Sequence, residues 1–139
     1  MYPPHLTAPM AQELNNAGVK SLTTASDVDN AMASKEGTTL VVVNSVCGCA
    51  AAYARPGVIN SLSNEYKPDN IYTVFAGVDQ EATAKAREYM LPYPPSSPSI
   101  ALFKEGKLVH FIERHHIENR SADMIADNLM MAYDRFCSE

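Results

Sequence analysis

The chain has 139 residues, 46% hydrophobic and 19% charged, a composition typical of one globular domain spanning residues 1–139. Its formal net charge of −5 at pH 7 argues against a nucleic-acid partner and against binding to an anionic membrane surface. The N-terminus lacks a basic stretch followed by an apolar core, and no apolar run is long enough to span a membrane. These features argue against a secreted, transmembrane or nucleic-acid-binding protein.

Cysteine usage bears on the compartment in which the protein works. The chain has three cysteines, Cys47, Cys49 and Cys137, which is an odd number and too few for a secreted disulfide scaffold. The sequence therefore indicates a cytoplasmic protein, where a close cysteine pair is more often catalytic or metal-binding than structural. It gives no indication of an oligomeric state.

The segment before the cysteine pair predicts two helices and two strands. Residues 6–17 and 26–35 have helical character, and Gly18 and Gly37 end these two helices. A short strand is expected over residues 19–22. Residues 38–44 are a run of β-branched and apolar residues without alternation, which indicates a strand buried on both faces.

The segment after the pair predicts three further helices and three strands. Residues 50–66 are rich in alanine and favour a helix that Pro56 should kink. A strand over residues 71–76 is followed by a helix that Asp79 should cap. The remaining expected elements are a hairpin of strands 99–104 and 107–113, and a last helix capped by Ser121.

The order of these elements predicts an α/β fold with the cysteine pair at its functional edge. Right-handed crossovers place the strand 38–44 centrally in the sheet. In such sheets, sites lie beyond the carboxyl ends of the strands and next to a helix start. Cys47 follows strand 38–44 and precedes the alanine-rich helix, so the sequence places it there.

The Cys-Gly-Cys sequence favours thiol–disulfide exchange at this position. A cysteine at a helix N-terminus meets unpaired backbone N–H groups and the positive end of the helix dipole, and both stabilise a thiolate. Cys47 is therefore predicted to be the attacking thiol. Cys49, deeper in the helix, should be more buried and less ionised, as suits a resolving cysteine. Gly48 should give the backbone the freedom that a Cys-x-Cys ring needs.

Two other interpretations of the pair remain open. A metal site would need further ligands, which His115, His116 and Cys137 could supply, although they lack the usual metal-ligand spacing. Inert packing is the second alternative, because free cysteine often behaves as a small hydrophobic residue. A peroxidase site is disfavoured, since no proline lies between Pro9 and Cys47.

Four residues outside the pair are weaker candidates. Pro98 precedes a strand and should face the cysteines, and the Ser97–Pro98 bond is a candidate for cis geometry. Glu118 and His115 could move a proton to or from a thiol, although residues after a strand are usually just solvated. Cys137 is expected to be a bystander in the last helical turn.

Several segments resemble known proteins. The stretch Ser97–Lys107 resembles the proline–strand–hairpin signature of the thioredoxin fold, in which the proline is cis. The chain more specifically resembles the bacilliredoxin family in the segments Thr38–Ala51, Val74–Gly77, Ala82–Tyr89, Pro95–Ser99 and Val109–Ile112 and at Arg114-His115. The resemblance runs from Pro9 to Cys137.

The resemblance implies a thioredoxin-like fold, with a central mixed sheet flanked by helices and the Cys-Gly-Cys sequence at the start of a Pro-kinked helix. It also implies a thiol–disulfide oxidoreductase of the bacterial cytoplasm with no bound cofactor or metal. Its co-substrate would be bacillithiol, and its partners would be S-bacillithiolated proteins.

Carried onto this chain, the resemblance has Cys47 take bacillithiol from a mixed disulfide. Cys49, or a second bacillithiol, would then resolve the adduct. The supporting residues would be Gly48, Ser97, Pro98 and Asn44. Disulfide isomerase or reductase activity and a non-enzymatic module remain alternatives.

The chain departs from related patterns at a few positions. Glu113 stands where family members often carry proline, and Asn119 replaces a glycine. Relative to thioredoxin, the cysteine spacer is one residue instead of two and no tryptophan precedes Cys47. Ordinary thioredoxin activity is therefore not expected.

Overall fold

The computed structural model describes residues 2–33 and 35–138. In chain order its elements are α1 (Pro4–Asn16), β1 (Lys20–Ser21), α2 (Ala25–Ala33), β2 (Thr38–Asn44), the π-helix η1 (Ala50–Ala54), α3 (Arg55–Ser61), β3 (Asn70–Phe75), α4 (Gln80–Tyr89), β4 (Ser99–Lys104), β5 (Lys107–Ile112), α5 (Arg114–Glu118) and α6 (Ala122–Phe136). Within these residues, no helix is long and apolar enough to cross a membrane.

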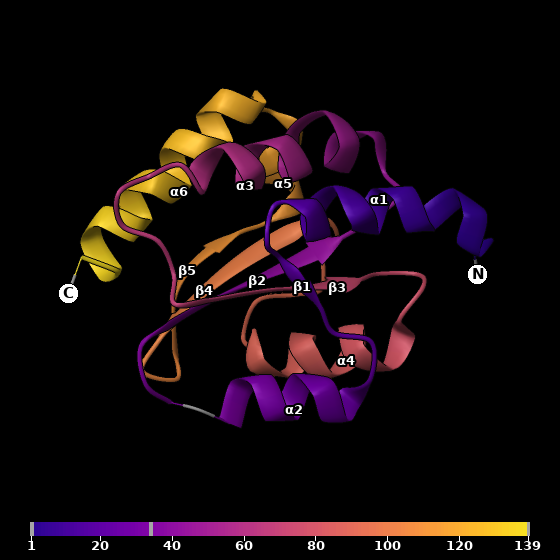
Figure 1. The fold of residues 1–139 in the computed structure, drawn as a ribbon, viewed down its shortest axis with the longest axis horizontal. Helices are drawn as coiled ribbons and strands as arrows, with labels where there is room; N and C mark the ends of the chain where they lie inside the picture. The colour runs from indigo at the N-terminus through magenta and orange to yellow at the C-terminus, as the bar shows by residue number, and fades with distance from the viewer. Residues whose placement is uncertain (1, 34, 139) are drawn as a thin grey trace.

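The five strands form one mixed sheet in the order β1-β3-β2-β4-β5 (Figure 1). β2 runs parallel to β3 and antiparallel to β4, so it occupies the centre. All seven residues of β2 are buried, which explains why its sequence is apolar on both faces. The sheet is therefore central and mixed, as the sequence analysis expected.

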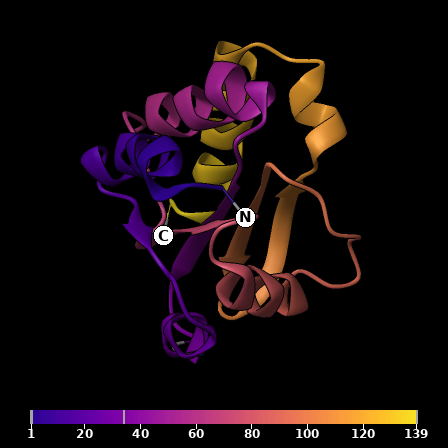
Figure 2. The same ribbon diagram turned by 90° about the vertical axis from the view of Figure 1, so that its right-hand side faces the viewer.

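Helices cover both faces of the sheet (Figures 1 and 2). On one face, Leu40 and Val42 of β2 belong to a core with residues of α1, α3, α5 and α6. On the other face, Val41 and Val43 pack with residues of α2 and α4. Successive side chains of a strand point to opposite faces, so this one strand contributes to both cores.

The helix after the cysteines differs from the expectation in its form and its end. The chain is helical from Gly48 to Ser61, but Ala50–Ala54 is a π-helix in which the Arg55 N–H donates to the carbonyl of Ala50. Pro56 follows this π-helix closely, and a proline lacks an N–H and crowds the turn before it. The distortion therefore precedes Pro56. The expected continuation to residue 66 is wrong, because α3 ends five residues earlier.

Other bounds differ in smaller ways. α2 ends at Ala33 and Lys35 is not helical, so the predicted end at residue 35 is wrong, while Ser34 lies outside the described residues. Asp79 precedes α4 as predicted, but its side chain makes no capping hydrogen bond. The Ser121 hydroxyl does cap α6, accepting from the N–H of Met124 at 3.2 Å. Helix α5 was not predicted from the sequence.

Candidate functional site

The end of β2 leads directly into the cysteine pair. The Ser45 hydroxyl accepts a hydrogen bond from the Cys47 N–H at 2.9 Å, which fixes the turn between the strand and the helix. The Cys47 carbonyl accepts from the N–H groups of Ala50 and Ala51 at 3.0 and 3.3 Å. Cys47 is thus bound by its main chain at the start of the helical segment, as the sequence predicted.

The two thiols lie side by side. The Sγ atoms of Cys47 and Cys49 are 2.6 Å apart, and the backbone N–H of Cys49 donates to the Cys47 Sγ at 3.4 Å. Partial burial raises the pKa of Cys47, but the hydrogen bonds from the Cys49 thiol and N–H outweigh it, together with the positive charge of Arg114. The pKa of Cys47 therefore lies below its ordinary value, which favours the thiolate.

Cys49 has the opposite character. Only 9% of its surface is exposed. Burial, the hydrogen bond to Cys47 and the nearby negative charge of Cys47 raise the pKa of Cys49 to about 11. Cys47 thus loses its proton more readily than Cys49, an arrangement that can attack a disulfide and then supply a second thiol.

The proline loop reaches the same end of the sheet. Val43 pairs with Ser99 in the ladder between β2 and β4, so Pro98 lies level with the end of β2. Pro98 is buried, Ser97 is half-buried, and the peptide bond between them is cis. A second cis bond joins Leu91 and Pro92.

Helix α5 brings a cation to this loop. The Arg114 guanidinium donates to the Ser97 carbonyl at 3.3 Å and to the Glu118 carboxylate at 3.3 Å. The negative charges of Cys47 and Cys49 raise the pKa of Arg114, so this exposed cation lies close enough to act on both thiols. The sequence analysis assigned Arg114 no role, because a cation after a strand gave no signal that α5 would turn it toward the cysteines.

The two acid–base candidates lie on the same short helix. The charge of Glu118 is among the causes that raise the pKa of Cys49, which places its carboxylate near that thiol. His115 is exposed and its ring packs against His116, with ring centroids 4.1 Å apart. The charge of Glu118 therefore acts on the Cys49 thiol. The His115 ring instead contacts the His116 ring.

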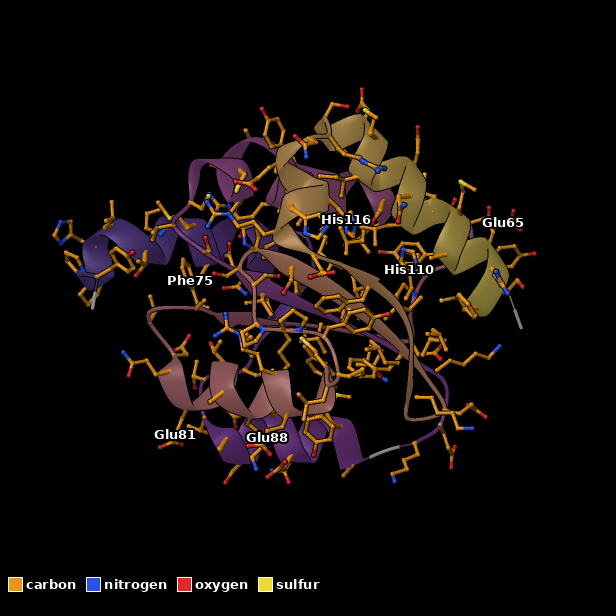
Figure 3. All side chains as sticks on the ribbon, turned by 180° about the vertical axis from the view of Figure 1, so that it is seen from behind. Glu65, Phe75, Glu81, Glu88, His110 and His116 are labelled. Atoms are coloured by element: carbon orange, nitrogen blue, oxygen red, sulfur yellow. The ribbon has the colours of Figure 1, made fainter. Side chains whose placement is uncertain are left out.

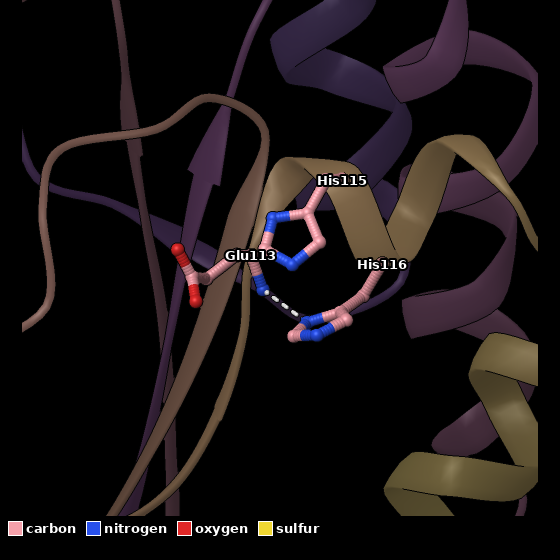
Figure 4. A group of neighbouring side chains, drawn as sticks. All are labelled: Glu113, His115 and His116. Atoms are coloured by element: carbon pink, nitrogen blue, oxygen red, sulfur yellow. Dashed lines mark hydrogen bonds between the residues drawn. The ribbon is translucent and has the colours of Figure 1, made fainter.

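Figure 4 shows a group of potential metal ligands formed by Glu113, His115 and His116. One ligand atom from each lies within 4.8 Å of the others. Two of the three are already engaged in a capping box. The Glu113 carboxylate accepts the His116 N–H, and the His116 Nδ1 accepts the Glu113 N–H at 3.3 Å. The Nδ1 of His116 is therefore already used to begin α5.

A cavity of about 230 Å³ lies beside this group, between β5, α5 and α6. His116, Arg120 and His110 line part of it, and His110 donates to the Asn128 carbonyl oxygen at 2.7 Å. Figure 3 shows His110 and His116 on the side of the molecule where β5 meets α6. Neither Cys47 nor Cys49 lines this cavity.

Cys137 lies away from the cysteine pair. Burial raises the pKa of Cys137, and a weaker, opposing influence on that pKa comes from Thr38 at the start of β2, the opposite end of the strand from Cys47. It is thus not positioned to share a metal with the cysteine pair.

Gly48 is helical, and a Cβ placed on it would meet nothing within 4 Å, so the dithiol conformation does not itself require glycine.

A buried polar network lies under the turn that carries Cys47. Asn44, a supporting candidate, is 1% exposed, and its side-chain Oδ1 accepts from the Ser45 N–H at 2.8 Å and from Arg55 at 2.9 Å. Arg55 in turn pairs with Glu13 at 2.8 Å. Neither Arg55 nor Glu13 was predicted from the sequence to have a role. The available signal was that Arg55 is the only charged residue between Ala50 and Asn64.

Comparison with solved structures defines the fold. The oxidised thioredoxin of Plasmodium falciparum superimposes with a TM-score of 0.58 at 18% identity, covering 86% of this chain and 98% of that one. The thioredoxin of Fasciola hepatica gives a TM-score of 0.56 at 16% identity, covering 85% and 99%. The chain therefore has a thioredoxin-like fold, and its close cysteine pair marks the class of thiol–disulfide oxidoreductases.

Sequence comparison then identifies the family. Residues 2–137 match a family described as disulphide isomerase. A bacilliredoxin from Cytophaga hutchinsonii is 63% identical over 134 residues, covering 96% of this chain and 98% of that protein. A bacilliredoxin from Halalkalibacterium halodurans is 52% identical over 136 residues, covering 98% and 94%. The chain belongs to the bacilliredoxin family and is a thiol–disulfide oxidoreductase.

Proposed function

We propose that this oxidoreductase removes bacillithiol from mixed disulfides on oxidised proteins, with Cys47 as the nucleophile. The observation that carries the proposal is the asymmetry of the thiol pair. The pKa of Cys47 is lowered and that of Cys49 is raised to about 11, while their Sγ atoms are 2.6 Å apart. The bacilliredoxin relatives support bacillithiol as the co-substrate.

The first step is an attack by the Cys47 thiolate on the bacillithiol sulfur of the mixed disulfide. A new bond forms between Cys47 and bacillithiol, the old disulfide breaks, and the substrate protein leaves as a thiolate. The charge of Arg114 and the N–H of Cys49 stabilise the attacking thiolate. The substrate cysteine is reduced and Cys47 is oxidised in its place.

The second step removes bacillithiol from Cys47. In one route the Cys49 thiol loses its proton and attacks the Cys47 Sγ, which forms the Cys47–Cys49 disulfide and releases bacillithiol as a thiolate. In the other route a second bacillithiol attacks the adduct, which leaves bacillithiol disulfide and a free Cys47 thiolate. We assign Glu118 as the acceptor of the Cys49 proton, with His115 as the less favoured candidate.

Four other residues are proposed to support this chemistry. Pro98 and Ser97, which lie level with the end of β2, would present backbone to the bound substrate. Asn44 would hold the turn before Cys47. Gly48 would allow the ring of the Cys47–Cys49 disulfide to close.

Each of these steps uses thiols alone, so the proposed enzyme needs no bound cofactor. We place it in the bacterial cytoplasm, because a thiol-reducing reaction requires a compartment in which free thiols persist. The named relatives come from bacteria, which is consistent with that assignment. The family match over residues 2–137 supports one domain for the whole chain.

The test follows the bacillithiol group by intact mass. The variant Cys49→Ala/Cys137→Ser is incubated with a bacillithiol-blocked protein, and Cys47→Ala is the control. We expect one bacillithiol on Cys47 of the test variant, an equal amount of free substrate thiol, and no adduct on the control. Equal rates with a glutathione-blocked protein would contradict the specificity for bacillithiol.

Disulfide isomerase activity is the second candidate, favoured by the description of the matching family. In this reaction the Cys47 thiolate would attack a disulfide within a substrate protein and form a covalent complex with it. A stable complex between Cys49→Ala and a scrambled substrate, without transfer of bacillithiol from a blocked protein, would favour the isomerase over our proposal.

A further inference from the structure

Arg55 is a buried charge at the first position of α3. Its side chain is 4% exposed, and its Nε donates to the Glu13 carboxylate of α1 at 2.8 Å. Burying a guanidinium is costly unless it is paired and its N–H groups are bonded. The location of its remaining partners therefore indicates what this cation does.

Those partners belong to the turn before Cys47. The Arg55 Nη1 donates to the side-chain Oδ1 of Asn44 and to the backbone carbonyl of Ser45, both at 2.9 Å. Asn44 is the last residue of β2, and Ser45 follows it. One nitrogen thus holds together the strand end and the first residue of the turn.

The chain of hydrogen bonds continues to the cysteine. The Asn44 side-chain oxygen also accepts from the Ser45 N–H at 2.8 Å, and the Ser45 hydroxyl accepts from the Cys47 N–H at 2.9 Å. Three links therefore connect Arg55 to the main chain of Cys47. The orientation of that main chain decides whether the Cys49 N–H points at the Cys47 Sγ, as it does at 3.4 Å.

Helix α1 joins this network at two points. Glu13 supplies the counter-charge, and the Met10 carbonyl accepts from the Asn44 side-chain amide at 3.3 Å. The Glu13 side chain is 39% exposed, so one end of the ion pair is solvated and only Arg55 is fully removed from water. The buried cation Arg55 is thus connected by hydrogen bonds to main-chain groups of Ser45 and Cys47.

We propose that Arg55, with Glu13 as its counter-charge, is a positioning residue that holds the turn between β2 and Cys47 in the orientation needed for thiolate attack. The inference rests on the proposed role of Cys47 as the nucleophile. Arg55 acts through Asn44 and Ser45 and does not itself contact the thiols. The charge that acts on the thiols is supplied separately by Arg114.

The test measures the pH profile of Cys47 alkylation by iodoacetamide, followed by mass spectrometry in a Cys137→Ser background. We expect Arg55→Met to shift the profile to higher pH and to slow alkylation at pH 7 by about tenfold. The matched control is Arg87→Met, which removes a half-buried guanidinium from α4 on the opposite face of the sheet. It should leave the profile unchanged.

Arg55→Lys separates position from charge. Lysine keeps a cation next to Glu13 but cannot bond Glu13, Asn44 and Ser45 with the fixed fork of a guanidinium. We therefore expect only partial recovery of the wild-type profile. Full recovery would overturn the proposal, because it would assign the effect to charge alone.

A stability measurement guards against a merely structural role. Arg55→Met leaves Glu13 without its partner, so the double variant Glu13→Gln/Arg55→Met is included to remove both charges. We expect this variant to unfold in urea near the wild-type midpoint and still to show the shifted alkylation profile. A wild-type profile in any folded variant lacking Arg55 would overturn the proposal, and if the methionine variants do not fold, Arg55→Lys alone decides it.

The readout is independent of the proposed substrate. Iodoacetamide reports on the Cys47 thiolate whether or not the protein accepts bacillithiol. If bacillithiol transfer failed in the wild type while Arg55→Met still shifted the alkylation profile, the positioning role would stand and the substrate assignment would fall. If Arg55→Met left the alkylation profile unchanged while the wild type transferred bacillithiol, the substrate assignment would stand and the positioning role would fall.

Discussion

The backbone N–H of Cys49 points at the Sγ of Cys47 across 3.4 Å, while the two Sγ atoms lie 2.6 Å apart. Cys49 therefore stabilises the Cys47 thiolate with both its main chain and its side chain. A single-residue spacer makes this possible, because the first turn of the helix brings both groups of Cys49 back to Cys47. The same contacts make Cys49 harder to ionise, because the hydrogen bond to Cys47 and the charge of Cys47 raise its pKa.

That suppression predicts a pH dependence of stability. The pKa of Cys49 is raised to about 11 from the 9.0 of an unperturbed thiol. Between these values the unfolded chain loses the Cys49 proton and the folded chain keeps it, so the free energy of unfolding falls as the pH rises from 9 to 11. The contribution is on the order of 2 kcal/mol and is fully present below pH 9.

Urea unfolding of the reduced protein at a series of pH values measures this decline. Cys49→Ala should flatten it relative to a parent that retains Cys49. Both proteins carry Cys137→Ser, because burial also raises the pKa of that thiol. Identical slopes in the two proteins would show that Cys49 ionises equally readily in the folded and unfolded states.

Removal of Arg114 should weaken the Cys47 thiolate. The cation lies on the exposed surface of α5, and its charge is among the causes that lower the pKa of Cys47. We expect Arg114→Gln to raise that pKa and to slow alkylation of Cys47 at pH 7. Arg120→Gln, which loses the same charge beside the cavity of α5 and α6, should have a smaller effect.

Salt provides a second readout for Arg114. Raising the ionic strength from about 0.01 M to about 1 M shortens the screening length from about 30 Å to about 3 Å. Alkylation of the wild type should slow over this range, while Arg114→Gln should respond less. Equal losses of rate in the two glutamine variants would assign the effect to net charge instead of to Arg114.

Gly48→Ala should affect the reduced protein and the oxidised protein differently. A Cβ at Gly48 meets nothing within 4 Å, so the reduced variant should be as stable as the wild type or more stable by about 0.4–1 kcal/mol. Closing a Cys47–Cys49 disulfide should become less favourable, because alanine restricts the backbone between the two cysteines. Urea unfolding under reducing conditions and a redox titration measure the two effects. A destabilised reduced variant would contradict the open environment of Gly48.

The parts of the fold that were predictable from sequence are those with a local signal. Strands Thr38–Asn44 and Ser99–Lys104 have the predicted bounds, because continuous apolar or β-branched runs end at turn residues. The location of Cys47 followed from the same reasoning, since a buried strand followed by an alanine-rich helix sets the edge of the sheet where sites occur. The Ser121 cap was likewise local.

The rest of the site depends on contacts between distant segments. Arg55 meets Glu13 across 42 positions and Asn44 across 11, and no periodicity in the sequence records such a pairing. Helix α5 has five residues, too few for a hydrophobic repeat to appear, so the placement of Arg114 could not be predicted either. The position of the cysteine pair, which depends on the order of the elements, was therefore predictable, and electrostatics that depends on packing was not.

The packing of α3 against α6 leads to a last prediction, at Gly57. A Cβ on Gly57 would lie 2.7 Å from the Cγ2 and 2.9 Å from the Cβ of Ile125, and 3.2 Å from the Ala122 carbonyl. None of these atoms belongs to the far end of a flexible side chain, so we expect Gly57→Ala to lower the free energy of unfolding by about 1–3 kcal/mol. Gly48→Ala is the matched control, because the same change there meets open space.

A double-mutant cycle identifies the contact responsible. Ile125→Ala alone should cost about 2–5 kcal/mol because Ile125 is 1% exposed and its loss leaves a cavity. In the pair Gly57→Ala/Ile125→Ala the new methyl group takes part of the vacated space, so the loss should be smaller than the sum of the single losses. Additive losses in urea unfolding would show that Gly57 is needed for a reason other than its contact with Ile125, and a Gly57→Ala protein as stable as the wild type would mean that α3 and α6 can move apart without loss.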